Sequence, residues 1–222
     1  MRNVVLISDP RVTSIPVEDC GEPLADVRGV LAVDGRLADP EGAYAHLRAG
    51  LLARLREAET ALPYGYRLRV VEGYRPPVLQ RKYFEEYKDQ LRGLHPGMSP
   101  EALHAAASRY VSPIEVAPHT AGAAVDLTLT TGDGTELDMG TEVNATPEQS
   151  DGACYTAAPN ISPAAREHRK ILTAALESAG MVNYPTEWWH WSHGDRYWAM
   201  TTGTPTARYG PLAFPPPEWS GA

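Results

Sequence analysis

Helical periodicity marks four segments of the chain. The clearest begins at Asp39-Pro40, which places an acceptor side chain at the N-cap and proline at the first helical position. Its apolar residues recur every three or four positions until Pro63 and Gly65, as expected for a helix with one face on a core. Three further helices are predicted at residues 77–91, 99–110 and 162–179.

Shorter apolar runs predict the strands. Residues 66–72 alternate polar and apolar side chains and stop at Gly73, while residues 119–129 turn at Gly122 and continue as a largely apolar strand. Another strand is predicted at residues 197–200. Strands separated by irregular loops, with the helices in blocks, predict an α+β fold with a mostly antiparallel sheet and helices packed on it.

The remaining segments lack such periodicity. Residues 1–38 are predicted to form an extended arm with one or two short strands, residues 131–161 a long loop-rich insertion, and residues 205–222 a proline-rich tail. At 222 residues, the chain is expected to form a single domain, residues 1–222.

A formal net charge of −8 argues against a nucleic-acid partner and against an anionic membrane surface, because both require a basic face. No stretch approaches the roughly 18 apolar residues of a membrane span. The apolar run at residues 4–7 is too short for a signal peptide, so we expect a cytoplasmic protein. Cys20 and Cys154 lack C-x-x-C spacing, which argues against a thiolate zinc site, and a disulfide is not expected in a reducing compartment.

The chemically richest stretch is residues 186–191, which carry Glu187 and His190 among three of the chain's five tryptophans. Aromatic bulk lowers the local dielectric constant and strengthens the interactions of ionisable groups with one another or with a metal. In a regular strand, positions 187 and 190 face opposite sides, so Glu187 is expected at the start of a strand or at a bulge.

Asp126 interrupts an apolar strand, and a buried lone carboxylate requires a cation. His119 precedes it across a glycine turn, which can fold the imidazole back toward the strand. With His190, these residues provide two imidazoles and one carboxylate, which fits an open zinc site with three protein ligands and room for water. Glu187 is then the candidate for the base that takes the proton of that water.

Simpler explanations exist for several of these residues. Taken alone, His119 is more readily explained as a structural histidine, and Arg75 could be a turn residue paired with Glu72. His193 is a rival metal ligand because it lies close to His190 in the sequence. The tryptophans are expected in the core and in the pocket wall. Four further histidines are expected to be solvated: His46, His95, His104 and His168.

Three motifs follow one another between residues 66 and 191: Gly73-Tyr74-Arg75-Pro76, His119-x-x-Gly122-x-Ala124-x-Asp126 and Glu187-Trp188-Trp189-His190. Together they resemble the signatures of the vancomycin-resistance-type D-alanyl-D-alanine dipeptidases. These enzymes are zinc DD-peptidases that share their fold with the hedgehog signalling domain, so the resemblance implies that fold here. Each motif alone is weakly specific, whereas three in the family's order are a strong signal.

The resemblance also implies roles for individual residues. One zinc ion per chain would be bound by His119, Asp126 and His190, with Glu187 as general base and acid. Arg75 would polarise the scissile carbonyl and stabilise the tetrahedral oxyanion, a role that suits the permanent charge and the fork of donors of a guanidinium group.

The sequence departs from the family at two positions. The family's serine two residues before the first histidine ligand helps to hold the substrate ammonium, and here it is Ala117; the aspartate of a Phe-Asp pair is here Asn144. An ammonium requires anionic or strong acceptor partners, so both differences weaken that end of the site. Glu115 and Glu142 are candidates to replace them. We expect an intact hydrolytic machinery with altered recognition of the amino end.

These features predict a zinc metallopeptidase that hydrolyses small dipeptides such as D-alanyl-D-alanine, in a small pocket walled by tryptophans. A DD-carboxypeptidase that trims longer cell-wall stem peptides is the enzymatic alternative, and an extracytoplasmic leader would favour it. A hedgehog-like zinc-binding module without catalysis is the other alternative, and loss of the base or of the arginine would favour it. The preferred dipeptide, the biological role and the oligomeric state stay open.

Overall fold

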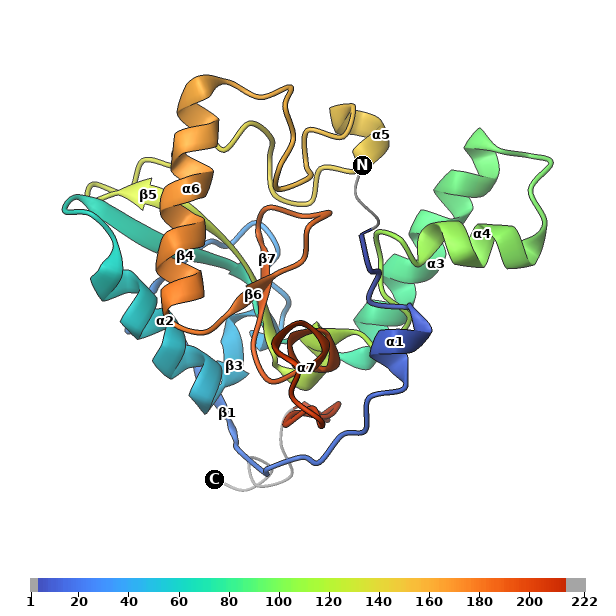
Figure 1. The fold of residues 1–222 in the computed structure, drawn as a ribbon, viewed down its shortest axis with the longest axis horizontal. Coiled ribbons are helices and arrows are strands. Elements are labelled where there is room, and N and C mark those ends of the chain that lie inside the picture. Colours follow the sequence, from blue (N-terminus) through green and yellow to red (C-terminus); the bar gives the residue numbers. More distant parts are fainter. Residues whose placement is uncertain (1–3, 215–222) are drawn as a thin grey trace.

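A five-stranded sheet forms the centre of the computed structural model, which describes residues 4–214 (Figure 1). Its strands lie in the order β2 (Ala32–Val33), β4 (Tyr66–Glu72), β5 (Ala124–Thr131), β7 (His190–Ser192) and β6 (Val182–Asn183). Strand β2 pairs in parallel with β4, and the other pairings are antiparallel. The α+β fold with a mostly antiparallel sheet is therefore confirmed.

The pairing of β4 with β5 builds the middle of the sheet. Leu68 lies opposite Leu129 and Val70 opposite Leu127, and all four side chains are fully buried. Because neighbouring strand residues point to opposite faces, the same alternation turns Asp126 to the other face of β5. One face of the sheet thus carries the core, and the other carries the polar side chain that the sequence singled out.

Helices α2 (Ala49–Ala61) and α6 (Pro163–Ser178) lie side by side on the core face of the sheet (Figure 1). Their apolar stripes join the same hydrophobic cluster as the leucines of β4 and β5. The buried leucines that they contribute include Leu51, Leu55, Leu172 and Leu176. The helix predicted at residues 162–179 is confirmed.

Helices α3 (Pro77–Leu94) and α4 (Pro100–Ala107) form a hairpin that projects to the side of the sheet (Figure 1). The hairpin has a hydrophobic cluster of its own, which is made of Phe84, Tyr87, Leu91, Leu103 and Ala107. The helices predicted at residues 77–91 and 99–110 are confirmed, although α4 already ends at Ala107.

The helix expected from Asp39 onward begins later than predicted. The preceding segment instead contains a turn followed by the 3-10 helix η1 (Ala43–Ala45) and the short strand β3 (His46–Arg48). Gly42 adopts a φ of 73°, in the left-handed region that a right-handed helix excludes. The carbonyl of His46 accepts a hydrogen bond from Tyr74 N–H at 2.7 Å. Long-range backbone pairing therefore replaces the helical hydrogen bonds in this segment.

The strand predicted at residues 197–200 is wrong, because these residues form the helix α7 (Arg196–Thr202). The Asp195 carboxylate caps the helix by accepting from the N–H groups of Tyr197 and Trp198, and Gly203 ends it with a φ of 71°. A short apolar run does not distinguish strand from helix, so here the capping residues decide.

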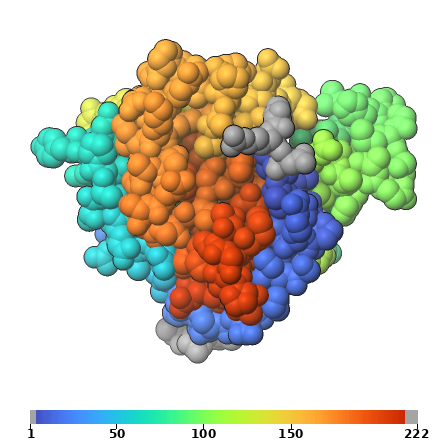
Figure 2. All heavy atoms as spheres, viewed as in Figure 1, coloured from blue at the N-terminus to red at the C-terminus, as the bar shows by residue number. Residues whose placement is uncertain are grey.

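The N-terminal arm packs along the C-terminal part of the chain, as Figure 2 shows. It contains the helical turn α1 (Pro10–Thr13), which contacts α7, and the strand β1 (Leu24–Asp26), which pairs with β3. With β2, this confirms the short strands expected in the arm. The loop-rich insertion contains one helical turn, α5 (Pro147–Ser150). Of the proline-rich tail, residues 215–222 lie outside the described residues.

Three single findings complete the description: the state of the cysteines, the burial of one histidine and the character of the helices. Cys20 is exposed and Cys154 is buried, and both are free thiols. The prediction that His46 is solvated is wrong, since it is 2% exposed and its Nδ1 lies 2.8 Å from the carbonyl oxygen of Gly42. Within residues 4–214, no helix is both long and apolar enough to cross a membrane.

Candidate active site

Three segments bring the predicted metal ligands together. Asp126 lies opposite His190 in the pairing of β5 with β7, so strand register alone makes them neighbours. His119 lies in the 3-10 helix η2 (Pro118–Ala121), and Gly122 at a φ of 63° turns the chain from η2 into β5. A side chain at position 122 would collide with Leu24, so glycine is required there for space as well as for its backbone conformation.

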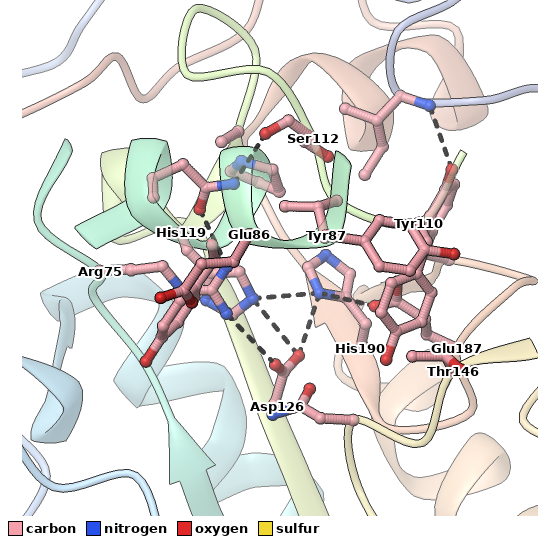
Figure 3. A pocket seen from close by; sticks show the side chains of 18 of the residues that line it. Arg75, Glu86, Tyr87, Tyr110, Ser112, His119, Asp126, Thr146, Glu187 and His190 are labelled. Carbon is pink, nitrogen blue, oxygen red and sulfur yellow. Dashed lines mark hydrogen bonds and ion pairs between the residues drawn. The ribbon is translucent and has the colours of Figure 1, made fainter. Parts of the chain in front are cut away.

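The three side chains meet in a compact, buried group (Figure 3). Asp126 Oδ1 lies 3.0 Å from His190 Nδ1 and 3.3 Å from His119 Nε2, and the two imidazole nitrogens are 3.1 Å apart. Their potential ligand atoms all lie within 4.8 Å of one another. Two nitrogens and a carboxylate oxygen that converge in this way are consistent with a metal site.

The protonation states also fit a cation at this point. His119 Nδ1 lies 2.7 Å from the Gly73 carbonyl oxygen, a contact that fixes the ring with its Nε2 facing Asp126 and His190. Burial lowers the pKa of His190, although Asp126 opposes this shift, so the ring is available in its neutral form. Burial disfavours ionisation of Asp126, but His119 and His190 outweigh it and lower the pKa of that carboxyl well below its usual range.

Glu187 lies in the turn that precedes β7, where its N–H donates to the carbonyl of Tyr184 at 2.9 Å. This position resolves the geometric problem of the strand, because Glu187 is outside it and faces the same site as His190. Its Oε2 lies 3.7 Å from His190 Nδ1. Burial and the negative charge of Asp126 raise the pKa of Glu187 well above its ordinary value, while Arg75 opposes the shift. A carboxylate of this kind is suited to exchanging a proton.

Arg75 follows β4 and is held on two sides. Its Nε donates to Glu72 Oε1 at 2.8 Å, its Nη2 donates to Glu72 Oε2, and its Nη1 donates to Gln80 Oε1 at 2.9 Å. The same Nη2 lies 4.0 Å from Asp126 Oδ2. The pairing with Glu72 therefore exists, and it holds the guanidinium at the edge of the candidate metal site.

All these side chains except Glu72 line one cavity of about 300 Å³. Its aromatic wall consists of tyrosines, namely Tyr83, Tyr87, Tyr110 and Tyr184. The tryptophans lie in the core as expected, but the expectation that they also wall the pocket is wrong: Trp188, Trp189 and Trp191 are at most 1% exposed and belong to the hydrophobic core. They lie in the same turn and strand as Glu187 and His190 and anchor that segment in the core.

The two positions that depart from the family pattern, Ala117 and Asn144, also line the cavity. The proposed replacements do not lie there. Glu142 is directed to Arg36, 3.4 Å away, with 85% of its side chain exposed, and Glu115 is absent from the described lining residues.

His193, the rival ligand, lies outside the ligand group, with its Nδ1 3.3 Å from the Gly180 carbonyl oxygen.

Some residues that line the cavity were missed by sequence reasoning. Tyr83 and Tyr87 fit the apolar stripe of their helix, and helical spacing gives no sign that they also face a cavity. Gln80 carried no signal at all, because its contacts are with residues of two other segments.

Comparisons with known proteins show which family the chain belongs to. The profile of peptidase family M15, described as D-Ala-D-Ala dipeptidase, matches residues 33–204. A D-alanyl-D-alanine dipeptidase of Synechocystis is 33% identical over 216 residues, covering 84% of this chain and 87% of its own. One of Escherichia coli is 29% identical over 127 residues, covering 57% of this chain and 54% of its own. A solved variant of a vancomycin-resistance D,D-pentapeptidase in complex with Zn(II) gives a TM-score of 0.45 at 16% identity, over 86% of this chain and 92% of that one.

The family match covers more than half of the chain and contains the whole candidate site, from Arg75 to His190. The Synechocystis relative is aligned over most of both chains. The buried His-Asp-His group is the candidate zinc site that such an enzyme requires. This chain belongs to the D-alanyl-D-alanine dipeptidases of peptidase family M15.

Proposed function

We propose that this chain hydrolyses D-alanyl-D-alanine and related small dipeptides with one zinc ion held by His119, Asp126 and His190. In this proposal Glu187 transfers the proton and Arg75 stabilises the developing negative charge. The convergence of these five side chains on one cavity carries the proposal. An accidental group of buried charges is not expected to combine a ligand set, a carboxylate of raised pKa and an oriented arginine.

The donor set favours zinc. Two imidazole nitrogens and one carboxylate oxygen leave a coordination position for water or substrate. A zinc ion in this position lowers the pKa of a water molecule and polarises a carbonyl oxygen. The Gly73 carbonyl, 2.7 Å from His119 Nδ1, fixes the orientation of that ring, so that its other nitrogen would be the one to hold a metal.

Glu187 acts first as base and then as acid. Its carboxylate accepts a proton from the attacking water and delivers it to the amine nitrogen of the departing amino acid. The buried surroundings that raise its pKa make it a stronger base than a solvated glutamate. The turn before β7 holds it on the same side of the cavity as His190.

Arg75 acts through its charge and its donors. A carbonyl oxygen that becomes an oxyanion gains most from donors that are already oriented, because they need no rearrangement during the reaction. Glu72 and Gln80 orient the guanidinium in this way, and its Nη2 faces the ligand group.

Recognition of the substrate ammonium is altered in this proposal. Ala117 offers no polar side-chain atom, and Asn144 offers a neutral amide where the family pattern has a carboxylate. Neither Glu115 nor Glu142 lies in the cavity lining to replace the missing groups, and the remaining carboxylate of the lining, Glu86 on α3, is exposed. With neither family partner in place, we infer a weaker hold on the ammonium than the family pattern implies, so that blocked amino ends are tolerated better.

A dipeptide panel on protein of measured zinc content tests this function. We expect zinc-dependent hydrolysis of D-alanyl-D-alanine, with N-acetylated and free dipeptides cleaved at rates within about tenfold of each other. A charge-assisted hydrogen bond to the ammonium is worth about 1.5–3 kcal/mol and would favour the free dipeptide by roughly 10- to 150-fold, but neither family partner is present to form it. Cleavage confined to longer stem peptides would identify a carboxypeptidase. Zinc binding without hydrolysis of any peptide would identify a non-catalytic module, and either result would overturn the proposal.

A further inference from the structure

Gln80 is a buried glutamine with both ends of its side-chain amide in use. It lies near the start of α3 and is 1% exposed. Its Oε1 accepts from Arg75 Nη1 at 2.9 Å, and its Nε2 donates to the carbonyl of Ser112 at 2.7 Å. Although Gln80 borders the cavity, its contacts are therefore with the protein.

These two hydrogen bonds connect separate parts of the site. Arg75 lies in the turn after β4, whereas Ser112 lies in the segment that leads to His119. Gln80 itself lies on the helix that carries the tyrosines Tyr83 and Tyr87 of the cavity wall. One amide thus joins the arginine, the wall helix and the approach to a metal ligand.

The remaining contacts of Arg75 explain what a third attachment adds. Glu72 holds Nε and Nη2, which is one edge of the guanidinium plane, and a group held along a single edge can still rock about it. The Tyr83 ring, 5.0 Å from the guanidinium carbon, covers one face. The bond from Nη1 to Gln80 adds a point of support away from the Glu72 edge.

The same contacts determine which donors stay available. An arginine side chain has five N–H donors, and three of them are used on Glu72 and Gln80, which leaves one on each Nη. Nη2 lies 4.0 Å from Asp126 Oδ2, so the guanidinium group borders the ligand group. Fixing the guanidinium plane therefore fixes the direction of the donors that an oxyanion would meet.

We propose that Gln80 is a positioning residue that orients the Arg75 guanidinium toward the reacting carbonyl. This inference rests on the proposed hydrolysis by the same site. Because Arg75 acts on charge that develops during the reaction, the loss of its orientation lowers kcat and leaves KM almost unchanged.

The test is a double-mutant cycle between Gln80 and Arg75. The Q80M variant keeps the volume of the side chain and removes both hydrogen bonds. We expect kcat for D-alanyl-D-alanine to fall about tenfold or more with KM within about twofold, because small misplacements of catalytic groups have effects of this size. In an R75A background, Q80M is expected to change kcat by less than about twofold, since Gln80 then has no guanidinium to orient.

The controls distinguish a failure of this inference from a failure of the proposed function and from a failure of the variant to fold. K82M places methionine on an exposed position of the same helix, and wild-type kcat is expected there. Zinc content and Tm show whether each variant is folded. A tenfold loss from Q80M in both backgrounds, or no loss in the wild-type background, overturns the role of Gln80 while the hydrolytic function stands. If wild-type protein cleaves no dipeptide, the proposed function itself fails.

Discussion

Asp126 and His190 face each other across the paired strands β5 and β7, with Asp126 Oδ1 3.0 Å from His190 Nδ1. Their contact is a consequence of strand register, because a slip by one residue would turn one of the two to the opposite face of the sheet. The candidate zinc site is therefore built on the pairing of two neighbouring strands of the central sheet. His119 completes it from the turn that leads into β5.

Replacing Asp126 by asparagine tests the ligand group. D126N removes the charge while preserving shape, and we expect zinc affinity to fall by more than about a hundredfold, since even outer partners of metal ligands are worth 10- to 100-fold. Added zinc should raise the Tm of the wild type but not that of D126N. D89N, at an exposed position of α3, is the matched control and should bind zinc normally. Equal zinc affinity in D126N and D89N would contradict the assigned site.

The R75K variant tests the arginine. Lysine keeps the charge but cannot donate to both oxygens of Glu72 and to Gln80 at once. We expect kcat for D-alanyl-D-alanine to fall about a hundredfold with a small change in KM. Steady-state kinetics on zinc-loaded protein measures both constants, with R81K on the surface of α3 as control. A change confined to KM would mean that Arg75 binds the substrate without acting on the transition state.

Restoring the family residues at the amino end should improve the enzyme. The double variant A117S/N144D supplies a hydroxyl and a carboxylate, and aspartate tolerates the φ of 66° found at position 144. We expect kcat/KM for D-alanyl-D-alanine to rise about tenfold, the value of one charge-assisted hydrogen bond. N-acetylated D-alanyl-D-alanine has no ammonium, so its cleavage should not improve. Equal gains for both substrates, or none, would exclude this explanation of the two departures.

Asp19 gives the fold a dependence on pH. It pairs with Arg48, whose side chain is fully buried, and it accepts from Gly210 N–H at 2.7 Å. Burial opposes ionisation of Asp19, but the N–H groups of Gly210 and Gly21 and the Arg48 charge outweigh it and lower its pKa. Because the folded-state pKa lies below the unfolded value of about 3.9, this contribution to stability is present above that pH and is lost as pH falls through the folded-state pKa.

The D19N variant measures that contribution. We expect the free energy of unfolding at pH 7 to fall by about 2 kcal/mol, less than for a fully buried pair because 34% of the Asp19 side chain is exposed. The difference between wild type and D19N should shrink below about pH 4, where the carboxyl of the unfolded chain becomes protonated, and should vanish below the lower folded-state pKa. Urea unfolding at pH 7, 5 and 3 tests this, and a difference that is constant over the range would rule out the ionised pair as its cause.

Local sequence patterns were enough to single out residues of the candidate site. The alternation within β5 set Asp126 apart from Leu127 and Leu129, and capping serines located α4 and α6. The spacing of Glu187 and His190 required Glu187 to lie at the start of a strand or at a bulge, and it lies in the turn before β7. Each of these features depends on residues close together in the sequence, where the backbone geometry is known in advance.

Long-range contacts explain what the sequence did not reveal. Residues 39–48 match a helical pattern, but the carbonyls of Tyr44 and His46 accept hydrogen bonds from the backbone N–H groups of residues 73 and 74 instead. The tryptophans lie in the hydrophobic core together with residues of β4, β5, α2 and α6. The tyrosines of α3 reach the cavity only because the α3–α4 hairpin is placed beside it. Gln80 depends in the same way on Ser112, which is 32 positions away in the chain.

The most direct test of the account is D-alanyl-D-alanine hydrolysis by an E187A variant of measured zinc content. Alanine removes the proton-transferring carboxylate and leaves His119, Asp126 and His190 unchanged. The account predicts one zinc per chain, as in the wild type, with kcat reduced about a thousandfold, within the range that a positioned acid–base group contributes. Zinc-loaded E187A protein that hydrolyses the dipeptide at the wild-type rate would contradict it.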